Sequence, residues 1–154
     1  WVFEHIPNPE QALRETRRVL KDGAVIYLFP AWDCQSWAAE GLPVRPDSDL
    51  TWTQRLEKKT IQFRETILFW ILTKPVTRSL RRLASAPTTL HYRRLKPNYS
   101  HYWMADSDAV NALDRDEMGR WFTSRGDECL NCMHQWRLWP DFEEPLIIRI
   151  HKRK

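Results

Sequence analysis

The first thirty residues combine a helical apolar pattern with a continuous apolar run. Apolar or small side chains recur three or four residues apart at Ala12, Leu13, Thr16, Val19 and Leu20. Asn8 and Pro9 are typical of a helix start, and Gly23 permits the left-handed turn that ends a helix. The pattern predicts a helix over residues 9–21. The unbroken apolar run of residues 24–29 then predicts a central strand of a parallel sheet, covered on both faces by helices.

Helical spacing returns between residues 50 and 83. It is set first by Trp52, Leu56, Thr60, Phe63, Ile67 and Trp70, and after Pro75 by Val76, Leu80 and Leu83. Proline cannot donate a backbone hydrogen bond, so Pro75 is expected to end one helix and begin another. We expect Trp52, Leu56, Phe63, Ile67 and Trp70 to face inward. We expect Arg78, Arg81 and Arg82 to face solvent or an anionic acceptor.

The C-terminal third predicts one helix and two strands. Asp114 and Glu117 form a capping-box pattern, and Gly126 is suited to end a helix. Between them, a stripe expected to be buried is formed by Met118, Trp121 and Phe122. These signals predict a helix over residues 115–125. Two extended segments follow, over residues 128–139 and 146–151. We expect them to pair as an antiparallel hairpin.

Two motifs near the N-terminus carry a family resemblance. The chain reads Val2-Phe3-Glu4-His5-Ile6-Pro7-Asn8-Pro9 at the expected end of a strand, and Arg17-Arg18-Val19-Leu20-Lys21-Asp22-Gly23 at the end of the helix. This succession closely resembles the second half of class I S-adenosylmethionine-dependent methyltransferases. The resemblance implies an α/β class protein with a three-layer Rossmann-like methyltransferase fold, represented by its C-terminal half. Residues 1–33 and 104–154 would form the core, with a closing antiparallel hairpin, and residues 34–103 a helical insert or lid.

The resemblance also implies methyl transfer from S-adenosyl-L-methionine to an unidentified acceptor. The family's glycine-rich loop and ribose-binding acid have no counterpart in this sequence, whose four glycines are not spaced as a nucleotide loop requires. The chain begins at Trp1 within an apolar run. We therefore expect a fragment that is inactive alone, the cofactor being bound mainly by an N-terminal part that precedes Trp1.

The resemblance places Trp1, Glu4 and His5 beside the cofactor. His5 is the candidate catalytic residue, because an imidazole titrates near neutrality and can take a proton from an attacking hydroxyl or amine. The alternative is that His5 orders the wall of the pocket by hydrogen bonding to backbone. Glu4 lacks a second ligand, since the residue three places earlier is Trp1, so we expect no metal.

Four aromatic or histidine side chains are candidates for contacts with the acceptor: Trp32, Tyr99, His101 and Tyr102. Trp32 follows a strand at the end where open α/β sheets bind ligands. The other three belong to a cluster that includes His91, Tyr92 and Trp103. This cluster is equally compatible with a pocket wall and with packing of the lid onto the sheet.

The cysteines offer a second metal hypothesis. Cys129, Cys132 and His134 could ligate zinc, but one such pair lacks the second pair of a structural site, and residues 129 and 132 of a strand point to opposite faces. We favour two ordinary strand cysteines. Three cysteines form no even set, so reduced thiols and a cytoplasmic location are expected.

Charge is unevenly distributed although the net charge is only +4. Residues 74–97 carry seven lysines and arginines and no acid, whereas residues 104–117 carry five acids. The basic stretch is interpreted as a solvated helix face, as a contact for anionic lipid or a phosphorylated acceptor, or, last, as a nucleic-acid contact. The expected partner is a small-molecule or lipid-linked acceptor. The alternative function is a non-catalytic α/β interaction module whose basic helical insert binds an anionic surface or partner.

Overall fold

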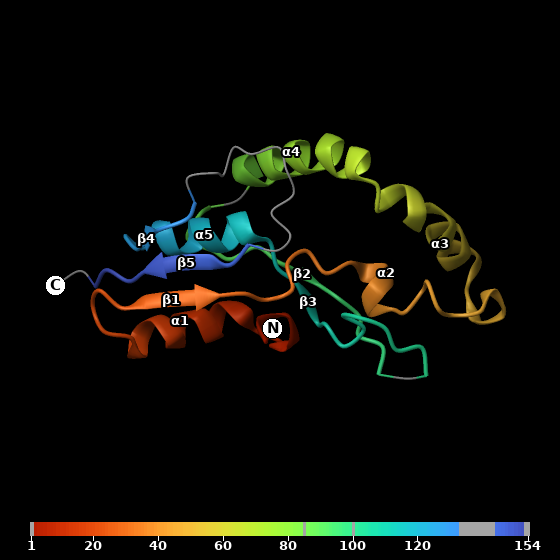
Figure 1. Ribbon diagram of the computed structural model, residues 1–154, viewed down its shortest axis with the longest axis horizontal. Coiled ribbons are helices and arrows are strands. Elements are labelled where there is room, and N and C mark those ends of the chain that lie inside the picture. Colours follow the sequence, from red (N-terminus) through yellow and green to blue (C-terminus); the bar gives the residue numbers. More distant parts are fainter. Residues whose placement is uncertain (1, 85, 100, 133–143, 153–154) are drawn as a thin grey trace.

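The computed structural model describes residues 2–84, 86–99, 101–132 and 144–152 (Figure 1). It is a mixed α/β structure. The helices are α1 (Pro9–Val19), α2 (Ser36–Ala39), α3 (Trp52–Arg64), α4 (Ile67–Ala84) and α5 (Arg115–Thr123). The strands are β1 (Val25–Leu28), β2 (Arg93–Arg94), β3 (Asn111–Ala112), β4 (Glu128–Cys129) and β5 (Leu146–Arg149). Within the described ranges, no helix combines the length and the apolar character that crossing a membrane requires.

Within the described residues, the main sheet has three strands in the order β1-β5-β4, and both neighbouring pairs are antiparallel. Strand β1 lies at the edge, with Val25 opposite Arg149 and Leu28 opposite Leu146. Side chains of a strand alternate between its faces, and only Ile26 and Leu28 of β1 are buried. Val25 and Tyr27 are 53% and 63% exposed. The prediction of a central strand covered on both faces is therefore wrong.

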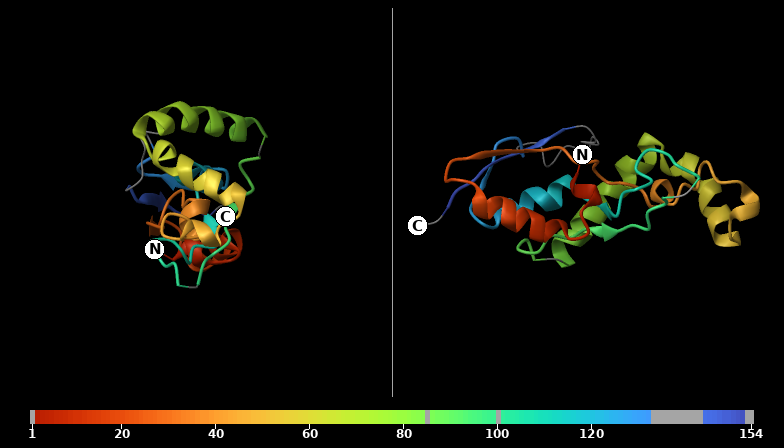
Figure 2. Two further views of the ribbon diagram at one scale, coloured as in Figure 1. Left: turned by 90° about the vertical axis from the view of Figure 1, so that its right-hand side faces the viewer. Right: turned by 90° about the horizontal axis from the view of Figure 1, so that it is seen from below.

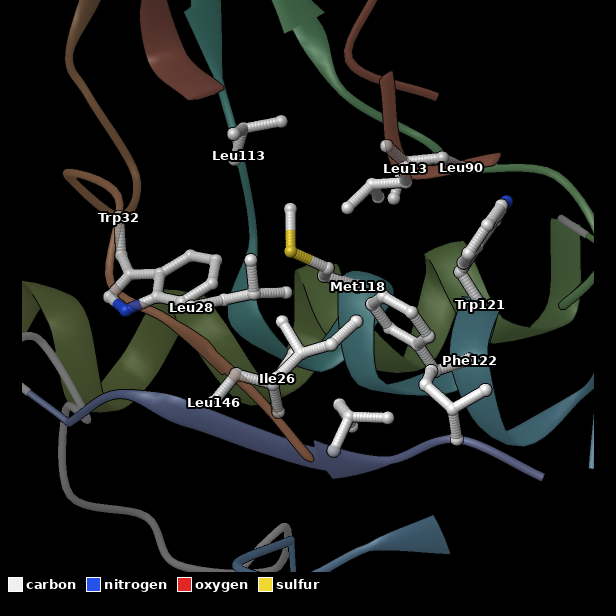
Figure 3. Packing of buried hydrophobic residues seen from close by; sticks show 12 residues of the cluster. Leu13, Ile26, Leu28, Trp32, Leu90, Leu113, Met118, Trp121, Phe122 and Leu146 are labelled. Carbon is white, nitrogen blue, oxygen red and sulfur yellow. The ribbon is translucent and has the colours of Figure 1, made fainter. Parts of the chain in front are cut away.

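Helices α1 and α5 pack side by side on the same face of this sheet, as the right panel of Figure 2 shows. The indole Nε1 of Trp121 donates to Glu10 Oε1 at 3.2 Å, and Arg17 forms an ion pair with buried Asp127 at 2.7 Å. The core beneath contains Leu13, Ile26, Leu28, Trp32, Leu90, Leu113, Met118, Trp121, Phe122, Leu146, Ile148 and Ile150 (Figure 3). The expectation that the helices predicted over residues 9–21 and 115–125 would together cover both faces of β1 is wrong, because both contribute to this one core.

The predicted helix starts are confirmed, whereas α1 and α5 each end two residues earlier than predicted. Asn8 Oδ1 accepts from the Gln11 backbone N at 3.2 Å, and Gly23 adopts a left-handed φ of 77° beyond α1. Asp114 Oδ1 accepts from the first-turn backbone of α5 at 2.8 Å, and Gly126 follows that helix with φ 86°. The expected strand end before α1 is wrong, since residues Phe3–His5 form a 3-10 helix.

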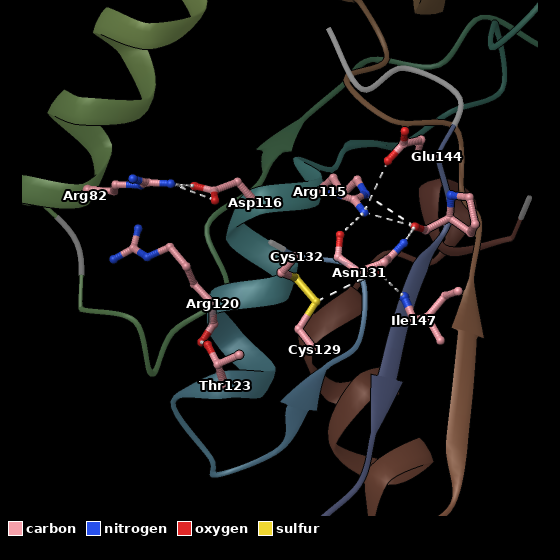
Figure 4. The surroundings of a disulfide bond; sticks show 11 residues. Arg82, Arg115, Asp116, Arg120, Thr123, Cys129, Asn131, Cys132, Glu144 and Ile147 are labelled. Carbon is pink, nitrogen blue, oxygen red and sulfur yellow. Dashed lines mark hydrogen bonds and ion pairs between the residues drawn. A yellow bond between two sulfur atoms is a disulfide. The ribbon is translucent and has the colours of Figure 1, made fainter. Parts of the chain in front are cut away.

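Strands β4 and β5 pair antiparallel, which confirms the closing hairpin within the described residues. Residues 133–143, with His134 and most of the first expected strand, lie outside them. Cys129 and Cys132 form a disulfide with their Cα atoms 5.5 Å apart (Figure 4). The expectation of reduced strand cysteines is wrong here, because β4 ends at Cys129 and the chain then bends back. Cys34 is a buried free thiol.

The insert forms two helices, but their boundary differs from the prediction. Helix α4 begins after Thr66, whose Oγ1 accepts from the Phe69 backbone N at 3.3 Å, and Pro75 lies inside α4. The prediction that Pro75 separates the helices is wrong, because Thr66 provides an earlier cap. A small second core of Trp37, Leu42, Leu50 and Ile61 holds α3.

The orientation of α3 and α4 is the reverse of the expected one. The predicted inward positions Trp52, Leu56, Phe63 and Ile67 are exposed, while Trp70 is half-buried. Arg82 binds Asp116 of α5, and Arg78 lies beside Asp114. The side chain of Arg81 lies outside the described part. The predicted orientation is wrong, because acids at the start of α5 attract the polar side of α4.

Candidate functional site

A cavity of about 430 Å³ opens at the carboxyl end of β1. Its walls come from the loop after β1, from α4 and from the segment before β2. They include Asp33, Trp70, Lys74, His91, Tyr92 and Asp114. Ligands of open α/β sheets bind beyond the carboxyl ends of strands. The helix α4 thus borders the cavity at the place where a lid was expected.

Asp33 is the central polar residue of this cavity. Its backbone is left-handed, with φ 56°, a conformation that Asp tolerates better than most residues. Its backbone N donates to Leu113 O at 2.7 Å, and its carboxylate binds Lys74 Nζ at 2.6 Å. Burial and then the nearby Asp114 carboxylate raise the pKa of Asp33, against the opposing effect of Lys74. The site therefore offers a carboxyl group suited to hydrogen bonding or proton exchange with a ligand.

The cavity also has aromatic and cationic walls. Lys74 Nζ lies 4.8 Å from the ring centroid of Trp70, within the range of a cation–π contact. His91 and Tyr92 line another part of the wall. Flat apolar surfaces with a few convergent polar groups are typical of small-molecule sites.

A second polar cluster surrounds Glu4 and His5. Glu4 is buried, and its Oε2 has no hydrogen-bond partner among the described residues. The His5 ring, 36% exposed, has Nε2 at 3.6 Å from Glu4 Oε1 and Nδ1 at 3.2 Å from the Asp108 backbone O. Asp108 thus holds the imidazole at the surface beside Glu4, an arrangement compatible with both the catalytic and the wall-ordering hypotheses.

Cys34 connects this cluster to the cavity. Burial raises the pKa of the Cys34 thiol, and the carboxylates of Asp106, Glu4 and Asp33 raise it further, so the group stays protonated. Its Sγ donates to Ala31 O at 3.4 Å. Glu4 O accepts from the Val110 backbone N at 2.9 Å, and Leu113 O accepts from the Asp33 backbone N at 2.7 Å, so residues 110–113 link the Glu4 cluster to the loop after β1.

Asp106 completes the cluster and has a left-handed φ of 64°. Burial raises the pKa of Asp106, and the Glu4 and Asp108 carboxylates add to this effect, partly offset by His5. The carboxyl groups of Glu4, Asp106 and Asp108 therefore influence one another here, and the His5 charge and a hydrogen bond with Cys34 act in the opposite direction on the pKa of Asp106.

The other predicted site residues are dispersed. Trp1 lies outside the described residues. Trp32 belongs to the core, where its Nε1 donates to Glu144 O at 3.0 Å, and it is not part of the cavity wall (Figure 3). Tyr99 and His101 are exposed, and the Tyr102 hydroxyl donates to the Asp49 carboxylate. The last three are also absent from the wall of the cavity.

The sequence pattern missed the residues that define the cavity. Asp33 had a usable signal, because it follows a strand at the end where ligands bind. The sequence gives no such signal for Lys74, because its partner Asp33 lies 41 positions away along the chain. His91 and Tyr92 were named in the aromatic cluster, and the structure separates them from its exposed members Tyr99 and Trp103.

Metal binding receives no support from the described residues. No group of three or more His, Cys, Asp and Glu side chains within them is arranged to hold a metal ion. Cys129 and Cys132 are bonded to each other, so neither supplies the thiolate that the zinc hypothesis requires.

Comparison of the chain with protein-family models, with curated proteins and with solved structures finds no match. The functional argument therefore depends on the residues and geometry of this chain.

Proposed function

We propose that the chain is the C-terminal half of a three-layer Rossmann-like domain that transfers a methyl group from S-adenosylmethionine to a small or lipid-linked acceptor. The observation that carries the proposal is the position of the Glu4–His5 pair. This pair, quoted above as a methyltransferase-like motif, is linked through residues 110–113 to the loop after β1, whose Asp33 lines the cavity. Sequence motif and local geometry thus suggest the same site.

The sheet is compatible with this proposal. Within the described residues β1 is an edge strand, and its outer face presents Val25 and Tyr27. Open strand edges and apolar sheet faces are usually covered in native proteins. In the proposed domain, parallel strands and helices that carry the glycine-rich loop would occupy this edge and this face.

The residues present fit part of a cofactor site. The buried Oε2 of Glu4 has no hydrogen-bond partner among the described residues and would accept one from an ammonium or hydroxyl group of the cofactor. When bound, S-adenosylmethionine supplies the electrophilic methyl group. Glu4 would orient that ligand, and Asp108 would hold the neighbouring His5 ring in place.

His5 would then act on the acceptor. Its half-exposed imidazole can accept a proton from a hydroxyl or amine as that group attacks. The cavity would align the acceptor, with Asp33 and Lys74 binding polar groups and Trp70 a flat surface. The non-catalytic alternative has weaker support, because two arginines of the insert, Arg78 and Arg82, are directed at acids of the same chain.

Calorimetry with S-adenosylmethionine and S-adenosylhomocysteine tests the proposal. Residues 1–154 should bind both negligibly, and any longer chain that the same reading frame encodes should bind them at micromolar concentration. Methionine alone serves as the control ligand. Micromolar binding by residues 1–154 would place the cofactor site elsewhere, and absence of binding by the longer chain would overturn the proposal.

A further inference from the structure

The outer side of α3 and α4 carries many exposed apolar side chains. Eight large ones on this side are between 53% and 86% exposed. They are Trp52, Leu56 and Phe63 of α3, and Leu68, Leu72, Val76, Leu80 and Leu83 of α4. Both helices lie at the rim of the molecule in Figures 1 and 2. We name this surface the α3–α4 face.

The polar side of α4 explains why this face points outward. Lys74 binds Asp33 at 2.6 Å, Arg78 lies 3.8 Å from Asp114, and Arg82 binds Asp116 at 2.8 Å. At roughly 100° per residue, Lys74 and Arg78 each lie about 160° around the helix axis from Val76. Ion pairs therefore attach α4 to the body, and its apolar stripe is directed away from the body.

The area of the α3–α4 face is large for a surface of this kind. Aromatic side chains have roughly 150–250 Å² each, so Trp52 and Phe63, which are 72% and 63% exposed, alone present on the order of 300 Å², and six exposed Leu and Val side chains add to this area. The largest apolar patch on a typical monomer is about 300–600 Å², and larger ones mark interaction sites. The face therefore needs an occupant.

The charges around the face favour a membrane over a protein. Lys74, Arg78 and Arg82 are turned toward the body and do not border the face, but α4 carries no aspartate or glutamate that would repel an anionic surface. On α3, exposed Lys59 lies on the same side as Trp52 and Phe63, with Arg55 beside it. An apolar stripe with Trp, Phe and Leu, bordered by basic residues, is typical of helices that lie in the plane of a bilayer.

We propose that the α3–α4 face docks onto the surface of a bilayer that contains anionic lipid. The apolar side chains would enter the boundary between headgroups and acyl chains, and Arg55 and Lys59 would contact lipid phosphates. The inner side of α4 borders the cavity, so docking would bring that cavity within one helix of the membrane. The proposal does not depend on methyl transfer.

Sedimentation with vesicles tests the proposal. The protein should sediment with vesicles of equal parts phosphatidylcholine and phosphatidylserine, and less with phosphatidylcholine alone. Leu72→Glu/Leu80→Glu should bind the mixed vesicles roughly tenfold or more weakly, because two apolar side chains would become charged at the boundary. The matched control is Val19→Glu/Val44→Glu, which changes exposed valines outside the face and should bind as the wild type does.

Two further measurements keep the test decisive. Circular dichroism and thermal melting should match for the three proteins. A bimane probe on Val76→Cys should shift to the blue with mixed vesicles, whereas the probe on Val44→Cys should not. Equal binding by the Leu72/Leu80 variant and the wild type would overturn the proposal. So would a dimer that the same variant abolishes, combined with no vesicle binding, since this would assign the face to a second copy of the chain.

Discussion

The ion pair between Arg82 and Asp116 provides a direct test of how α4 is attached. Arg82 Nη2 lies 2.8 and 2.9 Å from the two carboxylate oxygens of Asp116, and Arg82 Nε lies 3.2 Å from one of them (Figure 4). Asp116 is 5% exposed and Arg82 31% exposed. The substitution Arg82→Gln removes the charge and leaves a buried carboxylate without this partner.

The expected loss of stability follows from this geometry. Removing one partner of a fully buried ion pair costs about 3–5 kcal/mol, and exposed pairs contribute about 0–1 kcal/mol. Asp116 also lies in the first turn of α5, where the helix dipole stabilises a carboxylate by about 0.3–1 kcal/mol. We therefore expect Arg82→Gln to lower the free energy of unfolding by about 2 kcal/mol. For a chain of this size the melting temperature should fall by about 4–8 °C.

Urea unfolding followed by circular dichroism measures this loss, and Arg18→Gln is the matched control. Arg18 Nε lies 2.7 Å from Glu15, but both side chains are more than half exposed, so its loss should cost less than about 0.5 kcal/mol. A double-mutant cycle with Asp116→Asn should give a coupling of about 1 kcal/mol or more. Equal stability of the Arg82→Gln and Arg18→Gln proteins would refute the proposed attachment of α4.

Three other substitutions test the core, the acidic cluster and the disulfide. Phe122→Ala should lower the free energy of unfolding by about 3–5 kcal/mol, since Phe122 is fully buried, whereas Val19→Ala should change it by less than about 0.5 kcal/mol in the same urea assay. The raised pKa of Asp106 means that its ionised form opposes folding. Asp106→Asn should therefore raise the melting temperature at about pH 7 and give no gain at about pH 3, where the carboxyl is protonated in both states; an equal gain at both pH values would exclude a charge effect. The double substitution Cys129→Ser/Cys132→Ser should lower the free energy of unfolding by about 2 kcal/mol, which is the closure entropy expected for so short a loop. Reductant should leave the melting temperature of this variant unchanged and should lower that of the wild type to the same value.

Local signals explain which parts of the fold could be predicted from sequence. Helices α1 and α5 are specified by Asn8 and Asp114 at their starts and by Gly23 and Gly126 beyond their ends. Each signal acts within a few residues of its helix, so no tertiary information is needed. The closing hairpin was predicted for a similar reason, from alternation and a polar connection.

Distant partners explain what the sequence did not predict. Periodicity shows that α4 has an apolar side, but not whether that side faces the protein. The orientation of α4 is determined by its ion pairs with Asp33, Asp114 and Asp116. These acids lie about 30 to 40 positions along the sequence from Lys74, Arg78 and Arg82. The cavity has the same origin, because its walls come from segments that are far apart in the sequence, among them the loop after β1, α4 and the segment before α5 that contains Asp114.

Transfer of a labelled methyl group tests the proposed site most directly. Any longer chain that the reading frame encodes would be incubated with labelled S-adenosylmethionine and a cell extract, and the labelled product identified by mass. We expect transfer by the wild type and by His151→Ala, which changes an exposed histidine far along the chain from the site. His5→Ala should transfer roughly 10²–10⁴ times more slowly, as expected for loss of a general base, with little change in melting temperature. Transfer by His5→Ala at the wild-type rate, or absence of transfer by a folded wild type, would contradict the proposed site.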